Sequence, residues 1–553
     1  MIINGVKIMT IGEKIIHLRI ANDISQEKLA KMLNVTRQSV SKWESDDSLP
    51  QIDNVIELCK IFKVTADELL NRKIILHKNT KVVLPIKGDE QLKYFGTDGF
   101  RGETNKELTA DHAYKIGRFL GWFFSNPKYN KQKIGYKPRV VIGKDTRLSS
   151  YMFEYCVAAG LTASGANVKM LHVTTTPSVS YVIRQDCFDC GVMITASHNP
   201  FYDNGIKILN SDGEKIDDGI AKLIEYYIDG DLKKLDVKGG DLPFAEGENV
   251  GSIEDYASGR NRYIGYLISL AKHSFKDLKI GLDCSNGASW MIAKSVFTAL
   301  GAHVSVINDS PNGTNINENA GSTHIEGLQK LVVDNKLDAG FAFDGDADRC
   351  IAVDENGNVV DGDKIIYILA KKMKKSGSLK NNTVVTTIMS NSGLTAALKK
   401  IGIKNVQTTV GDRFVYEKMQ EENYVLGGEQ SGHIIIKKYA TTGDGILTAI
   451  MLTEQIIESK TTLSELAKDV ELLPQKTKSV RVTDKATVAC DEFVHAKFKE
   501  INDEIGDNGR AILRQSGTEP VIRIMIESAS IEKCDEYIEK IYGVIKKRGY
   551  VCE

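Results

Sequence analysis

The apolar positions of the chain recur with two different spacings, and the change between them divides the chain into two parts. Between residues 11 and 70 they recur every three or four positions, which is typical of short amphipathic helices. Hydroxyl residues precede three of these stretches and can cap a helix N-terminus. We therefore expect helices over residues 11–18, 26–33, 37–44, 52–62 and 65–70.

From residue 92 onward, short apolar runs of strand length alternate with helical patterns. Such alternation predicts βαβ units with parallel or mixed sheets. The expected strands are 140–142, 168–171, 191–194, 280–283, 304–307, 339–343, 383–388, 479–482, 511–514 and 522–526. The expected helices are 149–164, 288–300, 324–335, 364–375, 392–401, one starting at Asp444, and 531–547. Gly427-Gly428 predicts a turn.

These elements predict an α/β fold of several domains, since a chain of 553 residues is too long for one core. Residues 72–91 are lysine-rich, lack helical periodicity beyond their first positions and read as a linker. The expected parts are an all-α domain at 1–71, the linker, three α/β domains at 92–255, 256–362 and 363–475, and a smaller α+β domain at 476–553.

The composition argues against a membrane-spanning or secreted protein, and the overall charge indicates no particular class of partner. The formal net charge is −1, with 42% hydrophobic and 26% charged residues. No apolar run of roughly 18 residues predicts a membrane span, and the N-terminus does not resemble a secretory signal. Nine scattered cysteines suit reduced thiols, so we expect a cytoplasmic protein without membrane association.

The tight turn at Asn34-Val35 between two short helices predicts a helix-turn-helix. Residues 10–71 resemble the phage-repressor type of DNA-binding domain, which implies that 37–44 reads duplex DNA and that the protein can act as a homodimer. Residues 1–42 hold seven Lys and Arg against three Asp and Glu, whereas 43–71 hold two against seven. A protein-contact module is the alternative. The candidate DNA contacts are Thr36, Arg37, Gln38, Ser39 and Lys42.

Ser197 follows the apolar run 190–194 and precedes Asn199-Pro200, so we expect it on an exposed loop at the carboxyl end of a strand. Ligands of open α/β sheets bind at that end. Its neighbour His198 and Lys207, ten residues on, add groups that suit phosphoryl chemistry.

Asp344, Asp346 and Asp348 follow another predicted strand at intervals of two residues. Three carboxylates on one turn can converge on a cation, and oxygen ligands without His or Cys favour Mg²⁺. Arg349 comes directly after them. The sequence therefore predicts one magnesium ion in this loop.

Three further loops carry groups that suit a phosphorylated sugar. The glycine-rich run 427–433 offers hydrogen-bonding side chains for hydroxyl groups and ends at His433. The run 514–520, with Arg523, combines guanidinium groups, hydroxyl groups and a glycine, which is typical of a phosphate cradle. The turn 96–102 adds a glycine-rich segment with Arg101.

Together and in this order, the segments resemble the α-D-phosphohexomutase superfamily over residues 92–553. The resemblance implies four domains around a cleft, a phosphoserine at Ser197 and one Mg²⁺ on Ser197 and the three aspartates. It implies catalytic or substrate-contact roles for Arg101, Lys207, His433 and His198, and substrate binding by Arg349, Asp412, Arg413, Glu429, Gln430, Ser431, Arg514, Ser516, Gly517, Thr518 and Arg523.

The runs 96–102, 411–413 and 428–433 look most like the bacterial branch that acts on glucosamine phosphates. The resemblance implies interconversion of glucosamine 6-phosphate and 1-phosphate through a bisphosphorylated intermediate. Mannose and glucose phosphates are the alternative substrates. A transcription regulator that senses sugar phosphate is another alternative, although such a protein would be expected to have lost catalytic groups.

Overall fold

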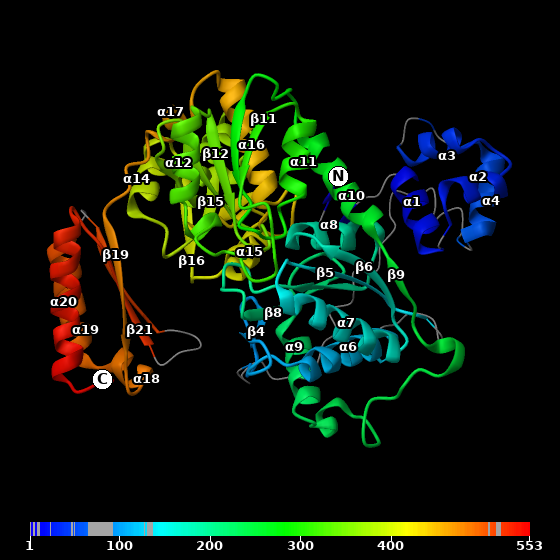
Figure 1. The fold of residues 1–553 in the computed structure, drawn as a ribbon, viewed down its shortest axis with the longest axis horizontal. Helices are drawn as coiled ribbons and strands as arrows, with labels where there is room; N and C mark the ends of the chain where they lie inside the picture. Colours follow the sequence, from blue (N-terminus) through cyan, green and yellow to red (C-terminus); the bar gives the residue numbers. More distant parts are fainter. Residues whose placement is uncertain are drawn as a thin grey trace.

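The computed structural model describes residues 2–3, 6–7, 11–22, 24–45, 48, 50–62, 64, 92–126, 128–129, 136–506, 509–515 and 521–552 (Figure 1). Its first elements are the short strands β1 (Ile2–Ile3) and β2 (Val6–Lys7), which pair antiparallel. The predicted fifth helix at 65–70 and the predicted linker at 72–91 lie outside the described residues.

The described residues of the N-terminal module form four helices: α1 (Ile11–Ala21), α2 (Gln26–Met32), α3 (Arg37–Glu44) and α4 (Ile52–Phe62). Ser25 and Thr36 cap α2 and α3, because their hydroxyl oxygens accept backbone N–H groups at 3.1 Å. Val40 and Trp43 are buried in the core of the module. These four predicted helices are confirmed.

The first α/β unit is built on a seven-stranded sheet in the order β3-β4-β8-β7-β5-β6-β9. Its central strands β5 and β7 are almost wholly buried, because helices cover both faces, and their sequences are accordingly continuous apolar runs. Its strands are β3 (Phe95–Gly96), β4 (Gly99–Glu103), β5 (Arg139–Lys144), β6 (Asn167–Val173), β7 (Cys190–Ile194), β8 (Asp203–Asn210) and β9 (Ile253–Asp255). Its helices are α6 (Ala110–Ser125), α7 (Leu148–Ala163), α8 (Thr176–Asp186) and α9 (Asp218–Ile228), with 3₁₀ turns η1 (Leu232–Leu235) and η2 (Gly247–Asn249).

The second and third units have sheets in the orders β11-β10-β12-β13-β14 and β16-β15-β17-β18. One apolar cluster from Tyr263 to Val470 is shared between them, so the two units pack as neighbours. The second comprises α10 (Ala257–Leu270), β10 (Lys279–Asp283), α11 (Ile292–Ala299), β11 (His303–Ile307), η3 (Gly321–Thr323), α12 (Glu326–Asn335), β12 (Ala339–Phe343), β13 (Cys350–Asp354) and β14 (Val359–Val360). The third comprises α13 (Gly362–Lys375), η4 (Lys380–Asn382), β15 (Thr383–Thr387), α14 (Ser392–Lys400), β16 (Lys404–Thr408), α15 (Asp412–Glu421), β17 (Leu426–Gly428), β18 (Ile434–Ile436), α16 (Gly445–Ser459) and α17 (Leu463–Ala467).

One local prediction in these units was wrong, and one predicted helix is present but shorter than expected. Gly427-Gly428 lies in β17 rather than in a turn, because β17 packs closely under a helix. A Cβ atom on Gly427 would come within 2.6 Å of the Met419 sulfur and 2.9 Å of the Val385 carbonyl oxygen. The helix predicted at 288–300 begins only at Ile292, after a turn.

The C-terminal domain has an antiparallel sheet in the order β19-β21-β20, and Figure 1 shows it in orange and red at one side of the molecule. Its elements are β19 (Gln475–Arg481), α18 (Lys485–Cys490), α19 (Glu492–Ile505), β20 (Arg510–Gln515), β21 (Val521–Glu527) and α20 (Ile531–Lys547). This arrangement confirms the predicted α+β character of the domain. Across the described part of the chain, no helix is both long and apolar enough to cross a membrane.

Candidate active site

Ser197 lies in the loop that follows β7, at the carboxyl end of the first sheet. Its backbone adopts the left-handed region with φ of +52°, which is uncommon outside glycine and often marks a functional loop. Its carbonyl oxygen accepts hydrogen bonds from the Arg147 guanidinium at 2.9 Å and from the Asn317 amide at 2.8 Å. The Ser197 side chain is buried rather than exposed, contrary to the prediction, because the loop is enclosed by the second unit.

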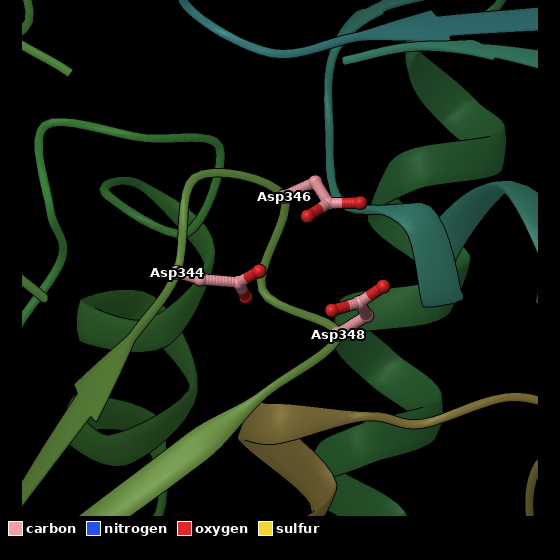
Figure 2. Close-up of side chains that lie close together, drawn as sticks. All are labelled: Asp344, Asp346 and Asp348. Atoms are coloured by element: carbon pink, nitrogen blue, oxygen red, sulfur yellow. The ribbon is translucent and has the colours of Figure 1, made fainter. Parts of the chain in front are cut away.

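Asp344, Asp346 and Asp348 occupy the loop between β12 and β13, and Figure 2 shows their carboxylates converging on a common space. Their potential ligand oxygens lie within 4.8 Å of one another, and all three side chains are buried. Ser197 Oγ donates a hydrogen bond to Asp344 Oδ2 at 2.5 Å, so the two loops meet. A Cβ atom on Gly345 would come within 2.4 Å of the Ser197 carbonyl oxygen, which explains the glycine.

The three carboxylates suit a magnesium ion. Burial, together with the neighbouring Asp348 and Asp346 charges, raises the pKa of Asp344 well above its ordinary value. Asp346 Oδ1 is buried and accepts no hydrogen bond from any residue that the structure describes. A divalent cation would relieve the repulsion and occupy the unpaired oxygen, and three oxygen ligands in close reach match the preference of Mg²⁺.

Basic side chains surround this loop. Lys207 on β8 reaches Asp346 Oδ2 at 2.8 Å and Asp348 Oδ2 at 3.1 Å. The Arg349 backbone N–H donates to Asp344 Oδ1 at 3.1 Å, and the Arg349 guanidinium lies 3.2 Å from His198 Nδ1. Burial, with the charges of Arg349 and Arg101, lowers the pKa of His198 to about 4, so this ring is neutral.

The third unit brings its own polar groups to the same place. His433 Nδ1 lies 3.7 Å from Asp348 Oδ1, and His433 Nε2 lies 3.4 Å from Asp412 Oδ2. Burial alone would lower the pKa of His433, but Asp412 and Asp348 outweigh it and raise the pKa to about 9. Three units of the chain therefore contribute to one charged cluster.

The other predicted sugar contacts lie around the start of α15 and the loop after β17. The Gly411 N–H donates to Glu429 Oε1 at 3.1 Å, and Gln430 Nε2 donates to Asp361 Oδ2 at 3.3 Å. Ser431 is exposed. Arg413 pairs with Asp218 and Glu417, so its guanidinium joins the third unit to the first.

The predicted phosphate cradle lies in the C-terminal sheet, and the structure describes only its two flanks. Arg514 on β20 and Arg523 on β21 are directly opposite partners in the antiparallel ladder. Burial and the facing Arg523 lower the pKa of Arg514. Like charges opposite one another destabilise a sheet unless an anion bridges them. A phosphate bound between the two guanidinium groups would be such an anion. Ser516, Gly517 and Thr518 lie outside the described residues.

The candidate DNA contacts occupy the start and the outer face of α3. Thr36, Arg37, Gln38 and Lys42 are exposed, whereas Ser39 is partly buried and its hydroxyl lies 2.9 Å from that of Thr36. Buried Glu44 of α3 links α1, α2 and α3, because its carboxylate accepts hydrogen bonds from Arg19 of α1 at 2.5 Å and from Gln26 of α2 at 2.7 Å.

Several residues near the site were not predicted. Arg147 and Asn317 both donate hydrogen bonds to the Ser197 carbonyl oxygen. Asp98 pairs with Arg101 and lies 3.3 Å from Lys207. Arg147 follows β5, so the rule that ligands gather at strand carboxyl ends could have found it. Asp98 stands in the glycine-rich turn beside Arg101, but an acidic residue there does not by itself predict a role.

Models of known protein families match both parts of the chain. Residues 92–234, 261–357 and 361–472 match alpha/beta/alpha domains I, II and III of phosphoglucomutase/phosphomannomutase, and 478–544 match its C-terminal domain. The chain belongs to the phosphohexomutase family. Residues 15–69 match a helix-turn-helix model, so the N-terminal module is a helix-turn-helix domain. Both resemblances expected from the sequence are confirmed.

Relatives of this phosphohexomutase include the phosphoglucosamine mutase of Lachnospira eligens, 57% identical over 83% of this chain and 99% of the relative. That of Bacillus subtilis is 46% identical over 82% of this chain and 98% of its own length. Among solved structures, a phosphoglucomutase/phosphomannomutase family protein from Burkholderia thailandensis aligns with a TM-score of 0.66 and 23% identity over 83% of this chain and 98% of its own. An N-acetylphosphoglucosamine mutase from Aspergillus fumigatus aligns with a TM-score of 0.60 and 17% identity over 83% and 96%.

Proposed function

We propose that this chain interconverts glucosamine 6-phosphate and glucosamine 1-phosphate through a phosphoryl group carried by Ser197. The observation that carries the proposal is that Ser197 Oγ of the first unit bonds to Asp344 of the second, within a cluster that also holds His433 of the third. The choice of glucosamine rests on the two relatives named phosphoglucosamine mutase.

In the first step, a hydroxyl group of the bound sugar phosphate attacks the phosphoryl group on Ser197. The P–O bond to Ser197 breaks, a P–O bond to the sugar forms, and a proton passes from the sugar hydroxyl to the protein while Ser197 regains one. The bisphosphate then turns end for end. Ser197 gives its proton to the protein and attacks the other phosphoryl group, the P–O bond from that group to the sugar breaks, and the released sugar oxygen takes a proton from the protein.

The residues around Ser197 divide this work. Lys207 lies beside two carboxylates of the cluster and can offset charge on the transferring phosphoryl group. Lys207 and His433 are the two candidates for the group that exchanges the proton. Arg101 and Arg349 add fixed positive charge near the phosphoryl group. When bound to Ser197 and the three aspartates, Mg²⁺ would supply Lewis-acid stabilisation of phosphoryl oxygens.

Sugar recognition is proposed for Asp412, Glu429, Gln430 and Ser431, with Arg413 beside them. The phosphate that does not react needs the same holder in both orientations of the sugar. Arg514 and Arg523 are proposed as that holder, with Ser516, Gly517 and Thr518 of the connecting loop. The facing pair of guanidinium groups supports this role.

We also propose that the helix-turn-helix domain binds duplex DNA through α3, with Thr36, Arg37, Gln38, Ser39 and Lys42 as contacts. The exposure of most of these side chains supports the proposal. One such domain makes few phosphate contacts, so two copies in a homodimer would be needed for useful affinity. The scattered cysteines support a cytoplasmic location.

The test is to compare kcat/KM of the purified chain for glucosamine, mannose and glucose 6-phosphates. The proposal predicts the highest value for glucosamine 6-phosphate. A higher value for either other sugar would identify the chain as a mutase of that sugar. Saturable binding of all three sugar phosphates without turnover would indicate that the protein senses sugar phosphate and is not an enzyme.

A further inference from the structure

Lys215 lies in the connection between β8 and α9, where the backbone is fixed by a tight turn. The Asn210 N–H donates to the Glu214 carbonyl at 2.7 Å, and the Ile216 N–H donates to the Ile208 carbonyl at 3.0 Å. Gly213 has φ of +70°, and a Cβ atom there would come within 2.6 Å of the Ser180 carbonyl oxygen. The position from which the Lys215 side chain starts is therefore rigidly set.

The Lys215 ammonium group contacts oxygen atoms of three other residues. Nζ lies 2.9 Å from the Thr97 carbonyl oxygen, 3.0 Å from Asp98 Oδ1 and 2.7 Å from Asp412 Oδ1. Burial would lower the pKa of Lys215, but Asp412 and Asp98 outweigh it and keep the pKa above its ordinary value. Two hydrogen bonds and one ion pair hold the ammonium group against protein oxygens, so Lys215 is suited to holding other residues in place.

Lys215 also closes a ring of six side chains around the site, in which carboxylates alternate with basic groups. Lys207 lies between Asp348 and Asp98, and His433 lies between Asp348 and Asp412. Lys215 supplies the remaining link, from Asp98 to Asp412. The ring therefore joins three units: Asp98, Lys207 and Lys215 belong to the first, Asp348 to the second, and Asp412 and His433 to the third. Within the ring, Lys215 is the cation that contacts none of the three aspartates proposed to bind metal.

We propose that Lys215 is a positioning residue for phosphoryl transfer, holding Asp98 and Asp412 so that Lys207 and His433 face Ser197. The inference rests on the proposed function and assigns a role within the same site. Asp98 pairs with Lys207 and Arg101 on one side, and Asp412 Oδ2 lies 3.4 Å from His433 Nε2 on the other, where the Gly443 N–H also donates to that nitrogen. Without the ammonium group, the half-buried carboxylates of Asp98 and Asp412 would have no cation between them, and their repulsion would move them apart.

A matched control stands next to Lys215 in the chain. Glu214 also joins this turn to α15, because it accepts hydrogen bonds from the Tyr416 hydroxyl at 2.6 Å and from Gln420 Nε2 at 3.0 Å. It lies outside the ring. Loss of the Glu214 contacts weakens the same junction between units without altering any charge beside Ser197.

The experiment compares Lys215→Met, Lys215→Arg and Glu214→Gln with wild type on the hexose 6-phosphate that wild type converts fastest. Because misplacement of reacting groups by about 1 Å costs on the order of 100-fold, Lys215→Met is expected to lower kcat by roughly that factor, with a smaller change in KM. Lys215→Arg restores the positive charge and should recover about tenfold or more of the loss. Glu214→Gln should stay within about twofold of wild type. Thermal melting checks that each variant is folded, and Lys215→Gln replaces Lys215→Met if the latter is not.

A double-mutant cycle with Asp412→Asn separates positioning from simple loss of charge. If Lys215 acts through Asp412, the double variant is no slower than the slower single variant. Multiplicative losses, a kcat for Lys215→Met within about threefold of wild type, or equal losses in Lys215→Met and Glu214→Gln would each overturn the proposal.

Amide hydrogen exchange gives a readout that does not depend on the substrate. In Lys215→Met, amides at 96–99 and 411–413 are expected to exchange faster than in wild type and in Glu214→Gln. Unchanged exchange there would count against the role of Lys215 even if the chain turned over no sugar phosphate. Failure of wild type to convert any of the three sugars would instead refute the proposed function alone.

Discussion

Asp344→Asn should have opposite effects on the protein without and with magnesium. In the metal-free protein, Asp344 repels Asp346 and Asp348, whose oxygens lie within 4.8 Å. At that distance and an effective dielectric constant of about 20, each pair costs about 3.5 kcal/mol. Lys207 and Arg349 offset part of this repulsion, and protonation of Asp344 limits it further. We expect a net gain of roughly 2 kcal/mol when the charge is removed.

With magnesium the order should reverse, because the variant loses a charged ligand. At a magnesium concentration of about 100 times the dissociation constant, binding stabilises wild type by roughly 2.7 kcal/mol. Each 1 kcal/mol corresponds to roughly 2–4 °C in Tm for a unit of 150–250 residues. Wild type should therefore melt roughly 5–10 °C higher in magnesium than in EDTA. The variant should melt above wild type in EDTA and barely respond to magnesium.

The assay is thermal melting of both proteins in EDTA and across a magnesium titration. Asp309→Asn is the matched control, because Asp309 is a carboxylate of the same unit that contacts Lys294 at 3.7 Å and the Ser310 hydroxyl at 3.5 Å. It should respond to magnesium as wild type does. The reasoning is refuted if Asp344→Asn melts below wild type in EDTA and still gains as much from magnesium.

Three further outcomes follow from the site, the core and the N-terminal domain. Ser197→Ala should bind sugar phosphate but lose almost all turnover, on the order of 10⁶-fold in kcat as for other removed nucleophiles, and peptide mass spectrometry should find the wild-type phosphate at Ser197 and nowhere else. Burial raises the pKa of Asp444 to about 6. The folded state thus prefers the protonated carboxyl group, so the free energy of unfolding falls as the pH rises from about 4 through 6. Asp444→Asn should remove up to about 3 kcal/mol of that pH dependence, measured by denaturation at pH 4 and 8. Arg37→Ala/Gln38→Ala should lose salt-dependent selection of genomic DNA fragments and keep mutase activity; equal recovery of fragments by both proteins would leave a protein-contact role.

Local patterns carried much of the fold and the centre of the site. The buried strand at 190–194 and the strand at 339–343 are continuous apolar runs followed at once by polar residues, and both signals lie within a few adjacent positions. Capping by Ser25 and Thr36 is equally local. These features needed no knowledge of what packs against them.

What the sequence could not show depends on contacts between distant segments. Ser197 was expected to be exposed but is buried, since a loop nearly 150 residues later covers it. Gly427 was assigned to a turn because the glycine pattern does not reveal the helix above it. Lys215 has no motif of its own, and the three residues that its ammonium group contacts lie more than 100 residues away in either direction.

The central claim is that Ser197 exchanges phosphoryl groups with the sugar, and one single-turnover measurement tests it most directly. Enzyme carrying an isotopically labelled phosphoryl group on Ser197 is mixed with unlabelled glucosamine 6-phosphate. The account predicts that the label appears at the 1-position of the product, while Ser197 regains an unlabelled phosphoryl group from the substrate. Label that stays on Ser197 during turnover, or that leaves only as inorganic phosphate, would contradict the account.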